Sequence, residues 1–257
     1  MATGLPLPAD GRPALVHHRK LNSRSGLEDT MEALRTLPAL HHVAEGDLCW
    51  DFTQDRELLY FHHPDLLLDT GSSEALDKAM EGGRLWTLEA ALSPAWNDLF
   101  FIVELKTGRG PREAALKKAL GLLEAARTGR YWVDTFSLQD IRLVKSLSPG
   151  TCTSLHTKVL AGGVLLKTAM EFPPLSLRRV TSLSDVDVVT VTYNTSPQRW
   201  LPVGGFRLDR EAERLRTLGR ELVCGGVLTP DMHRLVVASG VRAGYIKFDW
   251  RLLGAGT

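Results

Sequence analysis

Short apolar runs alternate with helical segments along most of this chain, and this alternation limits the fold more than any other feature. The main strands are expected at 14–18, 42–52, 99–105, 131–135, 151–155, 186–193, 222–227 and 243–248. Helices are expected at 87–92, 112–127, 138–147, 210–218 and 231–238. Strands that alternate with helices form parallel βαβ units. Eight such units in about 250 residues predict an α/β fold, a (β/α)8 TIM barrel.

The length of the chain indicates one domain. Its 257 residues and 44% apolar content are enough for a single core, and barrels of this size commonly form one domain. We expect the domain to span residues 1–257, with 1–12 as a flexible N-terminal segment. A short insertion is expected after the second strand, with a turn at 53–56, a return strand at 58–62 and a loop with helical pieces at 69–86.

The charge and cysteine content argue against several classes of protein. The formal net charge is +1, so no overall field favours nucleic acid or a membrane surface. Three widely spaced cysteines give neither a disulfide framework nor a paired zinc motif. No glycine-rich dinucleotide motif or P-loop is present. We see no signal peptide and no run of the roughly 18 apolar residues that a membrane helix needs, so we expect a cytoplasmic protein without stable membrane insertion.

Polar residues gather where the expected strands end. Two apolar runs end in His18 and His62, and Glu45 and Asp47 alternate along the second strand. Glu104 and Lys106 follow the run at 99–103 with the same spacing. Residues two apart on a strand share a face, and the carboxyl ends of barrel strands carry the sites of such enzymes. Histidines, carboxylates and basic residues in these positions are typical of a metal-assisted phosphodiester site.

In this order, the motifs resemble those of the glycerophosphodiester phosphodiesterase superfamily. The family opens its barrel with a strand ending in His-Arg-Gly and has a Glu-x-Lys motif after its third strand. The short segment between the second histidine and that motif is also similar to the related sphingomyelinase D-like phospholipases. The residues that carry the resemblance are His18-Arg19-Lys20, Glu28-Asp29-Thr30, Thr53-Gln54-Asp55-Arg56, His62, Glu104-Leu105-Lys106 and the segment from Met232 to Asp249. Lys20 departs from the family pattern, which has glycine there.

The resemblance implies a divalent cation, Mg²⁺ or Ca²⁺, bound by an acid pair on the second strand together with Glu104. Two registers are open for the pair. If the spacing between the acid pair and the turn at Thr53 matches the family without gaps, the pair falls on Asp47 and Cys49. If this chain has two extra residues in that interval, the pair falls on Glu45 and Asp47. Positions 45, 47 and 49 share a face in either register. Because a thiol is a poor ligand for a hard cation, we favour Glu45, Asp47 and Glu104 as the ligands.

The resemblance also implies roles for residues around the cation. His18 and His62 are expected to be the catalytic acid and base, because histidine titrates near neutral pH. Asp249 is expected at the rim of the site and not as a metal ligand. The residues expected to bind substrate are Arg19, Lys106, Tyr193 and Trp250. No role in the site is expected for the histidines that lack a motif or have the wrong strand parity, namely His17, His41, His42, His63, His156 and His233.

The leading hypothesis is therefore a metal-dependent phosphodiesterase that acts on a small glycerophosphodiester or related phosphodiester. A phospholipase D-like lyase that releases a cyclic phosphate is an alternative within the same superfamily. A non-catalytic binding protein on a degenerate barrel is an alternative of a different class, favoured by Lys20 and Cys49. We expect no nucleic acid partner, and the sequence leaves the oligomeric state open.

Overall fold

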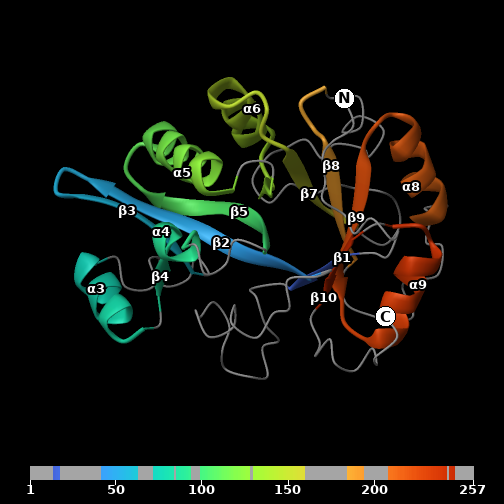
Figure 1. Cartoon of the computed structure of the whole chain (residues 1–257), viewed down its shortest axis with the longest axis horizontal. Helices are drawn as coiled ribbons and strands as arrows, with labels where there is room; N and C mark the ends of the chain where they lie inside the picture. Colours follow the sequence, from blue (N-terminus) through green and yellow to red (C-terminus); the bar gives the residue numbers. More distant parts are fainter. Residues whose placement is uncertain are drawn as a thin grey trace.

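Eight parallel strands close into a barrel at the centre of the structure (Figure 1). The computed structural model describes residues 14–17, 42–62, 72–83, 85–93, 99–127, 130–159, 184–193, 208–241 and 243–246. In barrel order the strands are β1 (Ala14–His17), β2 (His42–Thr53), β5 (Phe100–Arg109), β6 (Tyr131–Thr135), β7 (Thr153–Val159), β8 (Val188–Tyr193), β9 (Glu221–Val227) and β10 (Ala243–Ile246). Strand β1 pairs in parallel with both β10 and β2, which closes the barrel. The prediction of a (β/α)8 barrel is confirmed.

Helices follow the barrel strands and pack on their outer side (Figure 1). They are α5 (Arg112–Arg127), α6 (Leu138–Leu147), α8 (Leu208–Thr217) and α9 (Pro230–Ala238). Serine or threonine caps start two of these helices. The Ser137 hydroxyl accepts the N–H of Asp140 at the start of α6, and the Thr229 hydroxyl accepts the N–H of Met232 at the start of α9. These local signals explain why the sequence predicts the bounds of α6 to the residue and those of α9 to within one residue.

The insertion after the second strand is a small antiparallel addition to the barrel. Strand β2 pairs with β3 (Arg56–Phe61), and β3 pairs with β4 (Trp86–Thr87). Two helices, α3 (Ser73–Glu81) and α4 (Leu88–Ala91), complete it. Where the sequence indicates a loop with helical pieces, α3 is a nine-residue helix, because the Ser72 hydroxyl caps it and Leu76 and Ala79 are buried on one face.

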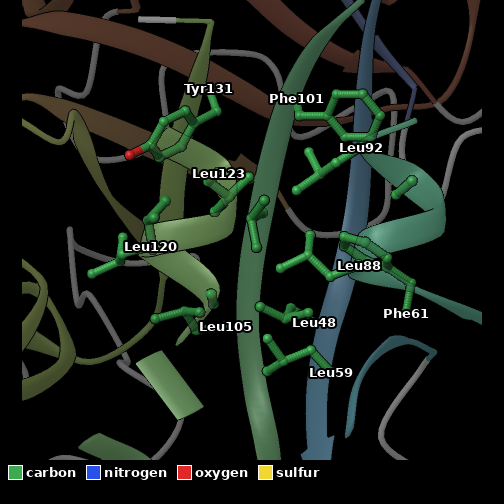
Figure 2. Packing of buried hydrophobic residues seen from close by; sticks show 14 of the residues in the cluster. Leu48, Leu59, Phe61, Leu88, Leu92, Phe101, Leu105, Leu120, Leu123 and Tyr131 are labelled. Carbon is green, nitrogen blue, oxygen red and sulfur yellow. The ribbon is translucent and has the colours of Figure 1, made fainter. Parts of the chain in front are cut away.

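The core has an inner and an outer layer, and strand alternation assigns each residue to one of them. On β5, Phe100 and Ile102 belong to the cluster inside the barrel, whereas Phe101 and Val103 face the helices. Figure 2 shows this outer layer between β2, β5 and the helices α4 and α5. Glu104 and Lys106 continue the inward series on β5. The strand pattern that builds the core therefore also directs these charges into the barrel.

Strands β2 and β5 remain paired beyond the barrel, where they approach too closely for most side chains. A Cβ atom on Gly110 would collide with the Phe52 carbonyl oxygen, and Gly110 has a φ of +86°. The guanidinium of Arg109 binds the buried Asp51 carboxylate through two hydrogen bonds of 3.1 and 2.7 Å. Arg109 Nη2 also donates to the Ser73 hydroxyl of α3 at 2.7 Å, which ties the insertion to the end of β5. Among the helices that the structure describes, none is both long and apolar enough to cross a membrane.

Candidate functional site

Three buried carboxylates lie in register on neighbouring barrel strands. Asp47 of β2 pairs with Glu104 of β5, and Glu104 pairs with Asp134 of β6. Asp134 faces inward because Trp132, two residues earlier, belongs to the cluster inside the barrel. All three side chains are 2% exposed or less. The parallel sheet thus brings acids that are far apart in the sequence to one level of the barrel.

Glu45, one inward position before Asp47 on β2, joins Asp47 and Glu104 in what we call the tri-carboxylate group. One carboxylate oxygen from each residue lies within 4.8 Å of the other two. Glu45 is also fully buried. Three carboxylates at this distance repel one another strongly unless a cation lies between them.

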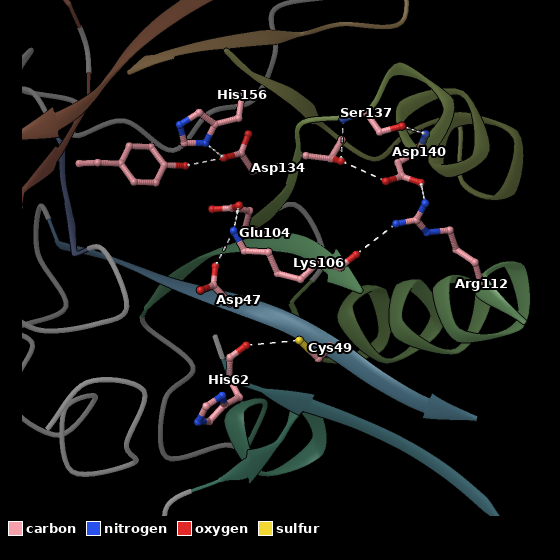
Figure 3. A network of polar contacts seen from close by, with 12 residues as sticks. Asp47, Cys49, His62, Glu104, Lys106, Arg112, Asp134, Ser137, Asp140 and His156 are labelled. Carbon is pink, nitrogen blue, oxygen red and sulfur yellow. Dashed lines mark hydrogen bonds and ion pairs between the residues drawn. The ribbon is translucent and has the colours of Figure 1, made fainter. Parts of the chain in front are cut away.

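Lys106 supplies a positive charge to the tri-carboxylate group. Its Nζ forms ion pairs with Glu104 and with Asp47, the second at 3.1 Å (Figure 3). Burial alone would lower the pKa of Lys106, but the nearby carboxylates, Glu104 above all, outweigh burial and raise its pKa above the ordinary value. The amine therefore stays protonated. One ammonium against three carboxylates leaves a negative excess among the described residues of the group.

The backbone of Lys106 is held from the next helices. Arg112 of α5 donates from Nη2 to the Lys106 carbonyl at 3.1 Å and pairs through Nη1 with Asp140 of α6 at 3.0 Å. Asp140 is buried and also accepts from the Thr135 hydroxyl at 3.1 Å. These contacts tie the end of β5 to α6, as Figure 3 shows.

The donor set of the tri-carboxylate group suits a hard divalent cation. Mg²⁺ and Ca²⁺ bind carboxylate oxygens, and they commonly take two or three from the protein. The negative excess of the group is the charge that such an ion neutralises. The described residues therefore fit a hard divalent cation such as Mg²⁺ or Ca²⁺.

The alternative ligand Cys49 lies outside the group. The register of β2 against β5 shifts between Leu48 and Trp50, where β2 leaves the barrel. Beyond this irregularity the Cys49 thiol packs against Tyr60 of the insertion and donates to the His62 carbonyl at 3.3 Å. Positions 45 and 47 thus share the interior of the barrel, and position 49 belongs to the insertion.

His62 lies beside the group through its backbone. Its N–H donates to the Asp47 carbonyl at 3.0 Å, directly after β3 ends. In Figure 3 the imidazole points away from the carboxylates of Asp47 and Glu104. The side chain is half-buried. Its assignment as an acid or base stays a prediction.

Several predicted site residues cannot be located from the described part of the chain. His18, Arg19, Asp249 and Trp250 lie outside the described residues, and Tyr193 is described only through its backbone at the end of β8. His18 directly follows His17, which pairs with Ala44 on the strand that carries Glu45.

The sequence analysis missed two residues that the fold brings next to Glu104. His156 Nδ1 lies 3.0 Å from Asp134 Oδ2, and the Phe136 ring stacks on the imidazole with a centroid separation of 4.4 Å. The expected strand at 151–155 ended before His156, whereas β7 continues to Val159 because its pairing with β8 continues. The sequence signal for Asp134 is an acid in the otherwise apolar strand 131–135, two residues after Trp132 and therefore on the same face.

Comparison with solved structures finds the same barrel in glycerophosphodiester phosphodiesterases. A protein from Silicibacter pomeroyi DSS-3, assigned as a glycerophosphoryl diester phosphodiesterase, matches with a TM-score of 0.66 and 12% identity over 96% of this chain and 95% of that one. A phosphodiesterase from Oleispira antarctica in complex with the product sn-glycerol-3-phosphate has a TM-score of 0.63 and 15% identity, covering 93% and 94%. A glycerophosphodiester phosphodiesterase from Parabacteroides distasonis has a TM-score of 0.63 and 16% identity, covering 92% and 94%.

No family model matches this chain, and no curated protein matches it. The solved structures are 12–16% identical to it in sequence. At that level the likeness establishes the fold. It agrees with the superfamily that the sequence motifs resemble.

Proposed function

We propose that this protein is a phosphoric diester hydrolase that uses a divalent cation to cleave a glycerophosphodiester or a related small phosphodiester. The observation that carries the proposal is the tri-carboxylate group, three buried acids whose oxygens lie within 4.8 Å of one another inside the barrel. The similar barrels belong to glycerophosphodiester phosphodiesterases, one of them in complex with sn-glycerol-3-phosphate. A single domain in the cytoplasm, acting on a small molecule rather than nucleic acid, remains part of the proposal.

Glu45, Asp47 and Glu104 would hold the cation, Mg²⁺ or Ca²⁺. When bound, the ion supplies positive charge that neutralises the phosphate. Lys106 is the second source of positive charge at the same place, because its amine stays protonated. With the carboxylates shared by a cation, the ammonium can bind a phosphate oxygen as a point charge. Arg19, with its forked guanidinium, is the other proposed phosphate ligand.

His18 and His62 are the proposed acid and base. One imidazole takes a proton from the attacking hydroxyl, and the other gives a proton to the leaving alcohol. His62 has to turn its imidazole toward the carboxylates for this, since in the present conformation the ring points away (Figure 3). Tyr193 and Trp250 are the proposed contacts to the alcohol parts of the substrate.

The products identify which hydroxyl attacks. Attack by water adds one water across the P–O bond and releases an alcohol and a phosphomonoester. Attack by a hydroxyl of the substrate itself releases the alcohol and leaves a cyclic phosphate, the lyase alternative. Phosphorus NMR separates the two because the cyclic ester and the monoester have distinct resonances.

Turnover of a panel of glycerophosphodiesters with Mg²⁺ or Ca²⁺ tests the proposal. We expect Glu104→Gln to abolish cation-dependent turnover, and His62→Ala to lower the rate by about 10²–10⁴, the usual size of acid–base catalysis. Glu81→Gln is the matched control, because Glu81 is exposed at the end of α3. A wild-type protein that binds the cation but cleaves none of the panel would instead be a binding protein on a catalytic fold.

A further inference from the structure

A second group of side chains of the types that bind metals shares Glu104 with the tri-carboxylate group. It consists of Glu104 on β5, Asp134 on β6 and His156 on β7, and we call it the Asp134–His156 group. One ligand atom from each residue lies within 4.8 Å of the other two, and all three side chains are buried. The proposed function gives no role to Asp134 or His156.

Asp134 is held in place on one oxygen and open on the other. Its Oδ2 accepts the Tyr245 hydroxyl at 3.1 Å and contacts His156 Nδ1 at 3.0 Å. Burial, and then the neighbouring Asp134, raise the pKa of Tyr245 well above its ordinary value, so the phenol stays a donor. Asp134 Oδ1 is buried and accepts no hydrogen bond from any described residue. A buried carboxylate oxygen without a partner is unfavourable unless a cation or donor meets it.

The described charges around this group are unbalanced. No lysine or arginine of the described segments forms an ion pair with Asp134, which contacts the His156 imidazole. Lys106 contacts Glu104 and Asp47, which places its ammonium in the tri-carboxylate group. The ammonium lies 5.5 Å from the centre of the Phe136 ring, which stacks on His156, but it forms no described ion pair with Asp134.

We propose that Glu104, Asp134 and His156 form a second divalent-cation site, in which the Glu104 carboxylate is shared between two ions. A carboxylate has two oxygens, so one residue can serve both groups. Imidazole nitrogen with two carboxylates suits Mn²⁺, Co²⁺ or Zn²⁺ better than the all-oxygen set, which suits Mg²⁺ or Ca²⁺. His156 binds as the neutral imidazole, and a proton held at the ligating nitrogen passes to solvent.

The ligands of the second site are already oriented by their neighbours. Tyr245 fixes the Asp134 carboxylate, and Phe136 stacks on the His156 ring at an interplanar angle of 15°. Hydrogen-bonded and packed ligands of this kind are typical of metal sites. Two ions that share a carboxylate would clamp a phosphodiester from two sides. That role in turnover rests on the proposed function, but occupation of the site does not.

Titration of the substrate-free protein with Mn²⁺ tests the second site. Calorimetry and electron paramagnetic resonance are expected to show two equivalents for the wild type, with magnetic coupling between the ions because they share a carboxylate. We expect His156→Gln to bind one equivalent without coupling. Tyr245→Phe keeps two equivalents but weakens the second by about 10–100-fold, the usual effect of removing an outer partner.

His233→Gln is the matched control, because His233 is also a buried histidine but lies on α9, outside both groups. It should keep two equivalents. One equivalent in the wild type, or two coupled ions in His156→Gln, would overturn the proposal. Asp134→Asn repeats the test if His156→Gln does not give the wild-type circular dichroism spectrum. A wild type that binds one equivalent and still cleaves a glycerophosphodiester would overturn the second site and leave the proposed function intact.

Discussion

Cation binding at the tri-carboxylate group should be visible as a gain in stability that depends on Glu104. Oxygens within 4.8 Å of one another, with an effective dielectric constant of about 20, repel by at least about 3.5 kcal/mol per pair of full charges. Lys106 offsets part of this repulsion, and a divalent cation relieves more of it. Because the group forms only in the folded barrel, binding free energy adds to the free energy of unfolding.

The size of the effect follows from mass action. At a Mg²⁺ concentration 100 times Kd, the wild type gains about 2.7 kcal/mol, which raises Tm by roughly 5–10 °C for a chain of this size. If Glu104→Gln weakens binding by about 100-fold, the gain at the same concentration falls to about 0.4 kcal/mol and the Tm shift to roughly 1–2 °C.

Thermal unfolding followed by circular dichroism, with and without Mg²⁺ or Ca²⁺, measures both shifts. The amide introduced by Glu104→Gln keeps nearly the shape of the carboxylate, so the variant tests charge rather than packing. Glu81→Gln removes an exposed charge and should shift like the wild type. Equal Tm shifts for the wild type and Glu104→Gln would refute the assignment of Glu104 as a ligand.

Three further predictions concern single contacts. Lys106→Met should lower kcat/KM for a glycerophosphodiester by about 10²–10³, because it removes the positive charge proposed to bind the phosphate, while the Mg²⁺-induced Tm shift is retained. Unchanged kinetics would contradict this role. In urea unfolding, Gly110→Ala should lower the free energy of unfolding by about 2–4 kcal/mol, because its Cβ would strike the Phe52 carbonyl and its φ is positive. Gly121→Ala, with open space around it in α5, should raise the free energy of unfolding by about 0.5–1 kcal/mol. Similar values for the two variants would refute the argument. Burial, and then Arg234, lower the pKa of His233 below 6.5. As pH falls below that value, the unfolded chain therefore binds a proton at His233 that the folded chain does not bind. The wild type should consequently lose stability more steeply with falling pH than His233→Gln.

Strand alternation made much of the site predictable. Once 99–105 was recognised as a strand with Phe100 and Ile102 on one face, the inward direction of Glu104 and Lys106 followed. The same rule grouped Glu45 with Asp47. These predictions needed only a period of two residues along each strand, which the apolar pattern of the chain shows directly.

Contacts between strands were harder to predict, because register across a sheet is set by pairing and not by the sequence of either strand alone. Asp134 stands beside Glu104 only through the pairing of β6 with β5. His156 was left outside its strand because the apolar run stops at Leu155, although pairing with β8 carries β7 further. Cys49 was grouped with Asp47 because a register shift where β2 leaves the barrel has no sequence signal of its own.

The buried acids of the barrel are unfavourable for folding and are held by the rest of the structure. Four carboxylates on three adjacent strands, namely Glu45, Asp47, Glu104 and Asp134, are 2% exposed or less. Burial of such charges without full compensation lowers stability by several kcal/mol for each ion. The outer layer of apolar residues between the strands and α4 and α5 provides the opposing stabilisation on the other face of the same strands (Figure 2). Since alternation separates the two faces, the chain can concentrate negative charge inside the barrel without weakening the packing outside it, and cations that enter the barrel recover part of the stability lost there.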